Sequence, residues 1–526
     1  MKIKRVLLLI GAFVLFGMSA GLMAKTINGS KEIKQAKADT ADVTISTDAE
    51  FASFISAVNG GTRYDNQVVQ LTNDVSYEIT AQPTAADPWS IFAGEFDGLN
   101  HTITVSINTT ATYVGLFRNI GNAEFKNAVF KNANINCSIT QSATSGSVVI
   151  APVAVYNNGL IQNVHTTVNF NISGASYFAG VVAKNQSAGI IENCSADGSI
   201  KGKQKVAGIT AENEGQIINC VNNCAIESVS SSYAGGITAI NGVNSTFVKA
   251  KIVNCINNAN VTATSTDLGG IAAFMYSNSE ISYCSNYGNI TSTNTGTGCG
   301  YGGIVGRING ADSNTGHSTK IEYCYNAGNV SSVRNCGGLI GLVNSGVKPA
   351  IEITGNLTAG DINGTTENAG TLIGWVNSNT ITVTDSWAVG AKLGVTALGI
   401  GAGSAAGATY SKADGVSDDF RAIIKAIREY NCVAISGFGT LYGGLDDGEK
   451  ALLNTINYYD ELNTYAMKTY GQAAEYIIDD QAHGARISLL DLNNNYWAII
   501  VVISVMVLST AAMVFVIRRK KHVASK

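Results

Sequence analysis

The sequence has little charge and almost no excess of either sign. Only 14% of its 526 residues are Asp, Glu, Lys or Arg, and the formal net charge is −4. A nucleic-acid-binding domain would need a basic face, which this composition does not supply. Apolar residues make up 45% of the chain, so the low charge does not indicate intrinsic disorder either. We expect a folded protein that binds no nucleic acid.

Long helical patterns are missing from the middle of the chain. No segment within residues 90–400 keeps a helical apolar period for three turns, whereas Gly reaches 57 residues and Asn, Ser and Thr are frequent. The apolar runs are short, β-branched and alternating. This pattern predicts many short strands joined by tight turns.

Long apolar runs occur at the two ends. Near the start, Lys2, Lys4 and Arg5 precede an uncharged run that continues to Ala24. A basic segment, an apolar segment and a small residue predict that residues 1–24 are a cleaved secretory signal peptide. The alternative is an uncleaved anchor, because the run is nearly long enough to cross a bilayer.

Near the other end, residues 496–517 contain no charge and begin with Tyr496 and Trp497. About 20 apolar residues at ~1.5 Å each cross a hydrocarbon layer of ~30 Å, which predicts a transmembrane helix. Four consecutive basic residues open the tail 518–526 and should stay in the cytoplasm. The chain is therefore predicted to be a single-pass protein of the cell membrane, with its N-terminal ectodomain outside.

Internal repeats organise the ectodomain. A Gly followed by an apolar or small pair recurs at nearly regular intervals along the chain. The repeated positions are Gly180, Gly208, Gly236, Gly270, Gly303, Gly338 and Gly370. Each unit is too small to bury its own apolar face, so neighbouring units must stack. Three short strands per unit predict an all-β fold, a right-handed parallel β-helix of roughly ten coils over residues 92–400.

The repeats resemble the GLUG-motif family of bacterial surface proteins, named for its Gly-Leu-x-Gly core. The best matches are Gly338-Leu-Ile-Gly341, Gly303-Ile-Val-Gly306 and Ala369-Gly-Thr-Leu-Ile-Gly374, and the resemblance covers about residues 92–395. It implies a surface location and adhesion, and it brings no catalytic residues. The sequence departs from the motif at Ala151-Pro152 and, in the slot of Gly306, at Ala211, Ala239 and Ala273.

The ten Cys residues of the chain raise the question of disulfides. Five of them share one position in consecutive repeats, where flanking repeats have other residues. The five are Cys194, Cys220, Cys255, Cys284 and Cys324, and the flanking residues are Ala128, Val164, Asn356 and Ser386. Such a slot is small and faces inward, so we expect a column of buried free thiols. Cys299 and Cys336 remain the best candidates for a disulfide.

Asn193, Asn219 and Asn254 directly precede three of these Cys residues. Stacked amides can hydrogen-bond along an array of strands, so the sequence predicts a polar ladder at a corner of the coil. A row of sugar-binding amides is the alternative interpretation.

Residues suited to catalysis show no grouping along the sequence. Glycoside hydrolysis needs two carboxylates on one face, ~5–10 Å apart. The acidic side chains of the repeats are scattered among different positions: Glu192, Asp197, Glu212, Asp267, Glu322 and Asp385. Neither Arg307 nor Arg334 has an acidic cluster beside it in sequence, and His101, His165 and His317 stand alone. No His accompanies the Cys column at ligand spacing. We expect no catalytic residue, cofactor or metal site.

Helices are predicted only in the flanking segments. In residues 25–91, Thr47-Asp-Ala-Glu50 forms a capping box before Phe51, Phe54, Ile55 and Val58, which indicates a short helix covering the open end of the β-helix. Residues 401–495 are predicted to be a small membrane-proximal helical module, with helices opening at Ser417 and Glu449.

Together these features predict a non-enzymatic adhesin or interaction protein that binds an extracellular glycan or protein. A polysaccharide-active lyase or hydrolase, and a purely structural surface protein, are the alternatives.

Overall fold

A computed structural model describes most of the repeat region. It covers residues 41–450 except for gaps at 83–89, 143–147, 172–176, 230–232, 245–248, 265, 297, 311–318, 346–350, 378–380, 385, 389–391, 395–399, 403–408, 412–416, 421 and 423–442. Every element below belongs to the compact unit that begins at Val43. The predicted signal peptide (1–24), transmembrane helix (496–517) and basic tail (518–526) lie outside the described residues.

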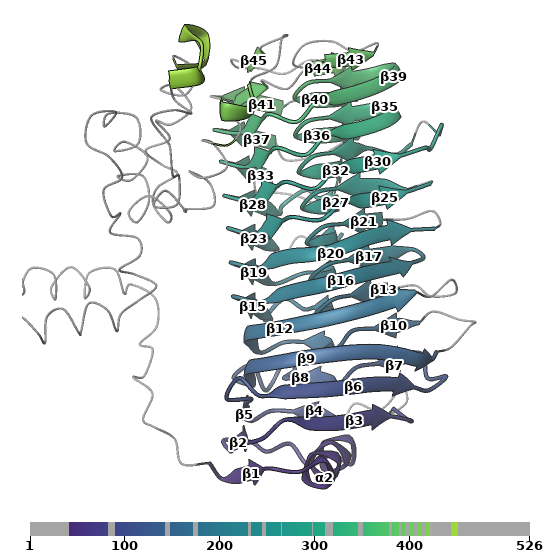
Figure 1. Cartoon of the computed structure of the whole chain (residues 1–526), viewed down its shortest axis with the longest axis vertical. Coiled ribbons are helices and arrows are strands. Elements are labelled where there is room, and N and C mark those ends of the chain that lie inside the picture. Colours follow the sequence, from purple (N-terminus) through teal and green to yellow (C-terminus); the bar gives the residue numbers. More distant parts are fainter. Residues whose placement is uncertain are drawn as a thin grey trace, which may run out of the picture. The chain divides into compact units, whose positions relative to one another are not determined.

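The chain folds as an all-β parallel solenoid of about nine turns, so the predicted fold class is confirmed at that level. Equivalent strands of successive coils lie side by side in one continuous stack (Figure 1). Val182, Thr210 and Thr238 pair in successive coils, at the same interval that separates the repeated Gly residues just before them. The right-handed sense of the coil stays a prediction.

The first stack of strands forms an 11-stranded parallel sheet. Its members are β4 (Ile91–Phe92), β8 (Phe117–Ile120), β11 (Ala154–Asn157), β14 (Val182–Asn185), β18 (Thr210–Asn213), β22 (Thr238–Asn241), β27 (Ala272–Tyr276), β32 (Val305–Asn309), β36 (Ile340–Val343), β40 (Ile373–Val376) and β44 (Ile400–Ala402).

The remaining strands form a 34-stranded sheet that wraps around the other sides of the coil. One side consists of β1 (Val43–Ile45), β2 (Val68–Leu71), β5 (Glu95–Asp97), β15 (Ile190–Glu192), β19 (Gln216–Ile218), β23 (Lys251–Val253), β28 (Glu280–Ser282), β33 (Thr319–Glu322), β37 (Ile351–Thr354) and β41 (Ile381–Thr384).

The next side contains the longest strands. They are β3 (Val75–Ile79), β6 (Thr102–Asn108), β9 (Val129–Gln141), β12 (Leu160–Asn171), β16 (Ser195–Gly202), β20 (Val221–Ser228), β24 (Ile256–Asn257), β25 (Val261–Ala263), β29 (Ser285–Asn286), β30 (Ile290–Ser292), β34 (Tyr325–Asn326), β35 (Val330–Gly337), β38 (Leu357–Thr358), β39 (Ile362–Gly370), β42 (Ser386–Ala388), β43 (Lys392–Gly394) and β45 (Thr409–Ser411).

A last stack of short strands leads back into the 11-stranded sheet. It comprises β7 (Tyr113–Val114), β10 (Val149–Ile150), β13 (Tyr177–Ala179), β17 (Lys205–Ala207), β21 (Tyr233–Gly235), β26 (Asp267–Gly269) and β31 (Tyr301–Gly302).

The core runs through the inside of the coil because strand residues alternate between buried and exposed positions. In β20 every second residue, from Asn222 to Ser228, is buried. The buried apolar side chains of successive coils form one continuous cluster. This is the expected consequence of stacking units that cannot bury their own faces.

The helix that the capping box predicts is present as α2 (Asp48–Asn59), at one end of the stack (Figure 1). The side chain of Thr47 accepts a hydrogen bond from the backbone of Glu50, whose own side chain accepts one from the backbone of Thr47. The Phe54 ring packs against Phe96 with a centroid distance of 5.8 Å. The helix therefore shares the core of the first coils.

Two predicted boundaries of the β-helix are wrong. Strands β1, β2 and β3 already pair in parallel with each other or with later coils, so the stack begins before residue 92. Strands β44 and β45 pair with β40 and β42, so it continues past residue 400. The Gly- and Ala-rich composition of that segment suggested a break, but small residues are compatible with strands.

Most of the predicted helical module (401–495) lies outside the described residues. Helical residues are described at 418–420, 422, 443–444 and 447–450. Glu449 accepts hydrogen bonds from the backbone of Ser417 and of Asp446, which joins the two segments. Within the described part of the chain, no helix has the length and apolar character to cross a membrane.

Candidate binding surface

The predicted Asn ladder is confirmed. Nδ2 of Asn254 donates to Oδ1 of Asn219 over 2.8 Å, and Nδ2 of Asn219 donates to Oδ1 of Asn193 over 3.1 Å. Asn163 and Asn132 form the same kind of bond in earlier coils. Because these amides bond to one another, the ladder stabilises the corner of the coil rather than presenting a row of unpaired amides to a sugar.

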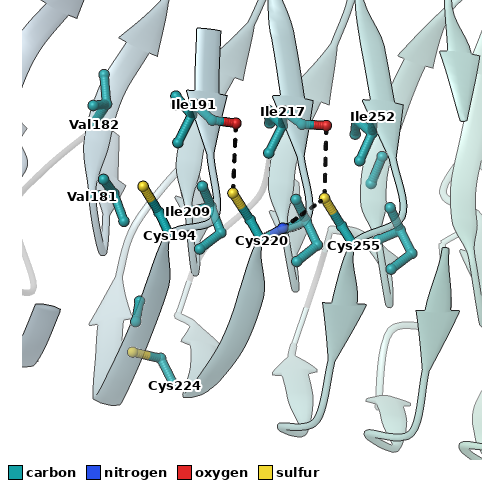
Figure 2. Packing of buried hydrophobic residues seen from close by; sticks show 14 of the residues in the cluster. Val181, Val182, Ile191, Cys194, Ile209, Ile217, Cys220, Cys224, Ile252 and Cys255 are labelled. Atoms are coloured by element: carbon teal, nitrogen blue, oxygen red, sulfur yellow. Dashed lines mark hydrogen bonds between the residues drawn. The ribbon is translucent and has the colours of Figure 1, made fainter. Parts of the chain in front are cut away.

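The predicted column of buried thiols is also confirmed. All five Cys residues are buried and free, and Figure 2 shows three of them in register in successive coils. The backbone N–H of Cys220 donates to Sγ of Cys255 over 3.4 Å. Burial raises the pKa of Cys255 well above its usual value. The thiols are packing groups, not nucleophiles.

The assignment of Ala128 to the flanks of this column is wrong. The strand register pairs Val164 with Ala133, so Ala133 and not Ala128 occupies the slot. The sequence contains two similar tetrapeptides, Phe125-Lys-Asn-Ala128 and Phe130-Lys-Asn-Ala133. Only the second lies within the long strand β9, which sequence spacing alone did not decide.

The proposed disulfide between Cys299 and Cys336 is wrong, because both thiols are free. The register pairs Cys336 with Tyr301, two positions after Cys299. Cys336 is buried and Cys299 is only partly buried. Both precede a Gly pair, but they do not occupy equivalent positions of the coil.

Two further Asn ladders, which the sequence analysis missed, lie inside the coil. One joins Asn157, Asn185, Asn213 and Asn241, and the other joins Asn222, Asn257, Asn286 and Asn326. All eight side chains are fully buried. In the second ladder, each Nδ2 donates to the Oδ1 of the next coil over 2.7–2.8 Å. Each buried amide is therefore satisfied, as burial requires.

The second ladder explains the repeated Gly. A Cβ at Gly236 would collide with the side chain of Asn257, and a Cβ at Gly270 would collide with that of Asn286. Each Gly lies in a bend between two strands, and a Cβ there would also collide with the carbonyl of the equivalent Gly in the next coil. The Gly at the bend and the Asn side chain that faces it inside the coil thus fit together. The Gly register was visible in the sequence, but its partner was not.

Two His residues that stand alone in sequence acquire partners from another coil in the structure. His165 Nδ1 lies 2.6 Å from Oγ of Ser195, and His165 Nε2 lies 3.1 Å from Oδ2 of Asp197. His101 Nδ1 lies 3.2 Å from Oδ1 of Asp74. The partners come from the neighbouring coil, one repeat away in the chain. His317 lies outside the described residues.

Ser195, His165 and Asp197 have the residue types of a hydrolytic triad, but their setting differs from one. The His and Asp side chains are 46% and 36% exposed on a sheet face. Ser195 pairs with Val221 on one side and with His165 on the other. Backbone N–H groups in such a ladder are used for strand pairing, whereas an oxyanion site needs donors aimed at the reacting oxygen.

Arg307 also acquires an acidic partner. Its Nη2 lies 2.8 Å from Oδ2 of Asp267 in the preceding coil, and its Nη1 donates to the carbonyl of Gly298 over 2.7 Å. Burial raises the pKa of Asp267 to about 7, against the opposing effect of Arg307. Asp267 also accepts a hydrogen bond from the backbone of Gly300.

These contacts belong to a larger surface feature, which we call the ring–cation strip. It follows the corner between the stack of short strands (β7 to β26) and the 11-stranded sheet. Its residues are Tyr113, Arg118, Tyr156, Tyr177, Lys184, Lys205, Glu212, Tyr233, Asp267, Phe274, Tyr276 and Arg307. Outward side chains from the two stacks contact each other along this corner.

Aromatic rings and cations pack together along the strip. The guanidinium of Arg118 lies 4.0 Å from the ring centroid of Tyr113 and 5.2 Å from that of Tyr156. Nζ of Lys184 and Nζ of Lys205 lie 4.8 and 4.4 Å from the ring centroid of Tyr177. Such contacts are attractive because the ring face is electron-rich.

Carboxylates complete the middle of the strip. Glu212 forms ion pairs with Lys184, at 2.8 Å, and with Lys205. Burial alone would raise the pKa of Glu212, but Lys205 and Lys184 outweigh it and hold the pKa below its usual value. Beneath the rings lies a small apolar cluster, separate from the main core, that includes Val149, Val155 and Ala183. The aligned repeats offered a signal for this strip, since Tyr177, Lys205, Tyr233 and Asp267 each stand three positions before a repeated Gly.

Comparisons with known proteins add little. No family model and no curated protein matches the chain. A solved structure from Bacteroides ovatus, described as "a putative immunoglobulin A1 protease", is similar over 70% of this chain and 84% of its own, with 16% identity and a TM-score of 0.35. Similarity at this level shows nothing about the activity or the substrate of this chain.

Proposed function

We propose that the protein is a non-enzymatic surface adhesin or interaction protein that holds an extracellular glycan or protein on the ring–cation strip. The observation that carries this proposal is the strip itself. The Tyr side chains there are half-buried, so each offers part of a flat ring together with a hydroxyl. This combination of apolar face and polar edge is enriched at binding surfaces.

The resemblance of the repeats to the GLUG-motif family supports the same function. We propose further, from sequence, that residues 1–24 direct secretion and that residues 496–517 anchor the solenoid at the cell membrane. The tail 518–526 would then face the cytoplasm.

A binding panel tests the proposed function. The full chain in detergent micelles is applied to arrays of glycans and of extracellular matrix proteins, beside the double variant Tyr177→Ala/Tyr233→Ala. The control is Tyr283→Asn, which changes a Tyr at the Asn-ladder corner to the residue used there in other coils. We expect the double variant to lose the binding that wild type and control share. A full chain that binds no member of either array contradicts the proposal.

Hydrolysis is a second candidate, favoured by the contacts of His165 with Ser195 and Asp197. In that case His165 Nδ1 would take the proton of Ser195 Oγ as the oxygen bonds to a carbonyl or phosphorus centre. The same His would return that proton to the leaving group as its bond to the centre breaks. A fluorophosphonate probe tests this, because it labels activated Ser. Labelling of wild type and Ser199→Ala, but not of Ser195→Ala, would favour the hydrolase over the adhesin.

A further inference from the structure

The rings of the strip follow the repeat of the solenoid. Tyr113, Tyr177 and Tyr233 occupy equivalent positions of the coil, with Val149 and Lys205 at the same position in the coils between them. Each pair of successive Tyr residues is thus two strand spacings apart, which is ~9.6 Å at ~4.8 Å per strand.

The facing sheet supplies rings in some of the intervening coils. Tyr156 lies one coil before Lys184 and belongs to the same coil as Val149. Phe274 lies one coil after Ile240, in the coil that follows Tyr233. The Tyr113 and Tyr156 centroids are 6.4 Å apart, and those of Tyr233 and Phe274 are 4.9 Å apart. Rings therefore alternate between the two sides of the corner over six coils, except in the coil of Lys205.

Charge in the strip is largely compensated within it. Lys184 and Lys205 share Glu212, and Arg307 pairs with Asp267. Glu214 lies near Glu212, and its pKa is raised first by burial and then by that neighbour. An acidic polymer would have to displace the carboxylates from these ion pairs. A neutral ligand can instead hydrogen-bond to the paired side chains and leave the ion pairs in place.

We infer that the strip holds a neutral polysaccharide in an extended conformation, parallel to the solenoid axis, with one sugar per coil. This inference rests on the proposed function and names its ligand. A sugar in an extended β-1,4-linked chain advances by close to one strand spacing, and successive sugars turn opposite faces outward. Every second sugar then presents the same apolar face to Tyr113, Tyr177 and Tyr233. On the facing sheet Tyr156 is half-buried and meets an alternate sugar, whereas Phe274 is buried against Tyr233 and supports that ring.

Calorimetric titration of the full chain in detergent micelles with β-1,4-linked gluco-oligosaccharides tests the inference. We expect affinity to rise with length and to level off at about six sugars, because the rings of the strip extend over six coils at one strand spacing each. Tyr177→Ala and Tyr233→Ala should each weaken binding of the hexamer about tenfold, the effect of ~1.4 kcal/mol of ring contact. Tyr177→Phe, which keeps the ring, should weaken it about threefold or less, and Tyr283→Asn should leave it unchanged.

The outcomes separate this inference from the proposed function. Stronger binding of polygalacturonate oligomers than of neutral ones would overturn the choice of a neutral ligand. Affinity independent of length would overturn the axial placement while leaving adhesion intact. Unchanged affinity in Tyr177→Ala and Tyr233→Ala would place the oligosaccharide outside the strip and overturn the inference. If the full chain binds a matrix protein through the strip but no oligosaccharide, the inference fails and the proposed function stands. If it binds nothing in either array, both fail.

Discussion

Successive coils between Asn132 and Gly355 turn one corner on a residue with a positive backbone φ angle. Asn193, Asn219 and Asn254 have φ angles of 53°, 54° and 53° there. Asn tolerates this left-handed conformation better than other non-Gly residues, because its short amide can bond locally. Two later coils use Tyr283 and Tyr323, whose rings stack with centroids 5.3 Å apart. The Asn ladder therefore serves the backbone turn as well as the contact between coils.

The thiol column predicts a sharp difference between two substitutions of Cys255. Cys255→Ala should lower the free energy of unfolding by about 1 kcal/mol, because Ala133 already occupies the equivalent slot. Cys255→Arg should lower it by about 3–5 kcal/mol, because it buries an unpaired charge. Thermal melting of the full chain measures both, with Cys299→Ala as the matched control at a partly exposed site. Equal damage from Ala and Arg would contradict the packing role of the thiol.

Asp267 predicts a dependence of stability on pH. Its pKa is raised to about 7 by burial, despite the pairing with Arg307, so between about pH 4 and pH 7 the folded state binds more protons than the unfolded state. Stability from this group is present at low pH and is lost as pH rises towards 7. The free energy of unfolding should therefore fall less from pH 5 to pH 8 in Asp267→Asn than in wild type. The difference between the two falls should be about 1–3 kcal/mol.

Thermal melting at the two pH values, with wild type and variant in parallel, isolates this effect. Arg307 stays charged throughout, so the cost of leaving it without its carboxylate is the same at both pH values. Parallel pH profiles for wild type and Asp267→Asn would show that Asp267 does not titrate in this range.

At the scale of elements, the sequence predicted one partner of the Gly–Asn contact inside the coil, the Gly, but not the other, the Asn. The spacing of Gly236 and Gly270 predicted the repeat, because Gly recurs in the chain at nearly constant intervals. The stretch of chain from Gly236 to its partner Asn257 is longer than that from Gly270 to Asn286, so no fixed offset links the two. Contacts across the inside of a coil depend on loop lengths, which vary from coil to coil.

The buried ladder predicts different outcomes for two neighbouring Asn residues. Asn257 accepts from Asn222 and donates to Asn286, whereas the side chain of Asn258 bonds only to Asn223 among the contacts described. Asn257→Ala should cost about 2–4 kcal/mol, because polar atoms of two buried amides lose a partner. Asn258→Ala should change stability by about 0.5 kcal/mol or less. Urea unfolding of both variants measures the difference; similar midpoints would contradict a structural role for the ladder.

For the whole molecule, the sequence predicted the solenoid because the repeated Gly and the short apolar runs recur visibly along the chain. It did not predict the strip or the contacts of His165, because Ser195 and Asp197 reach that residue only through the register between coils. The same holds for Arg307 and Asp267, which belong to different coils. Contacts between coils require the exact length of each repeat, which no local pattern of the sequence gives.

Membrane topology is a prediction from the chain ends. Since Arg518 to Lys521 follow the predicted span, residues 25–495 should lie outside the cell. Protease added to intact cells should remove the ectodomain and leave a small membrane-bound C-terminal fragment. Cells opened before treatment provide the control for cytoplasmic exposure. Full protection of the ectodomain in intact cells would place it on the other side.

The solenoid as a whole predicts that one complete coil can be removed. Deleting residues 208–235 takes out a single repeat and joins Ala207 to Gly236, so that Asn185 meets Asn241 and Cys194 meets Cys255 in the shortened stack. Stability in such an array is close to a sum over neighbouring repeats, so the variant should melt cooperatively, within about 5 °C of wild type, and keep its β-sheet circular dichroism. Deleting only residues 208–221 removes half a coil, and the strands that follow can no longer meet their equivalents. That variant should be insoluble or unfolded. A whole-coil deletion as damaging as the half-coil deletion would mean that stability depends on contacts beyond adjacent coils.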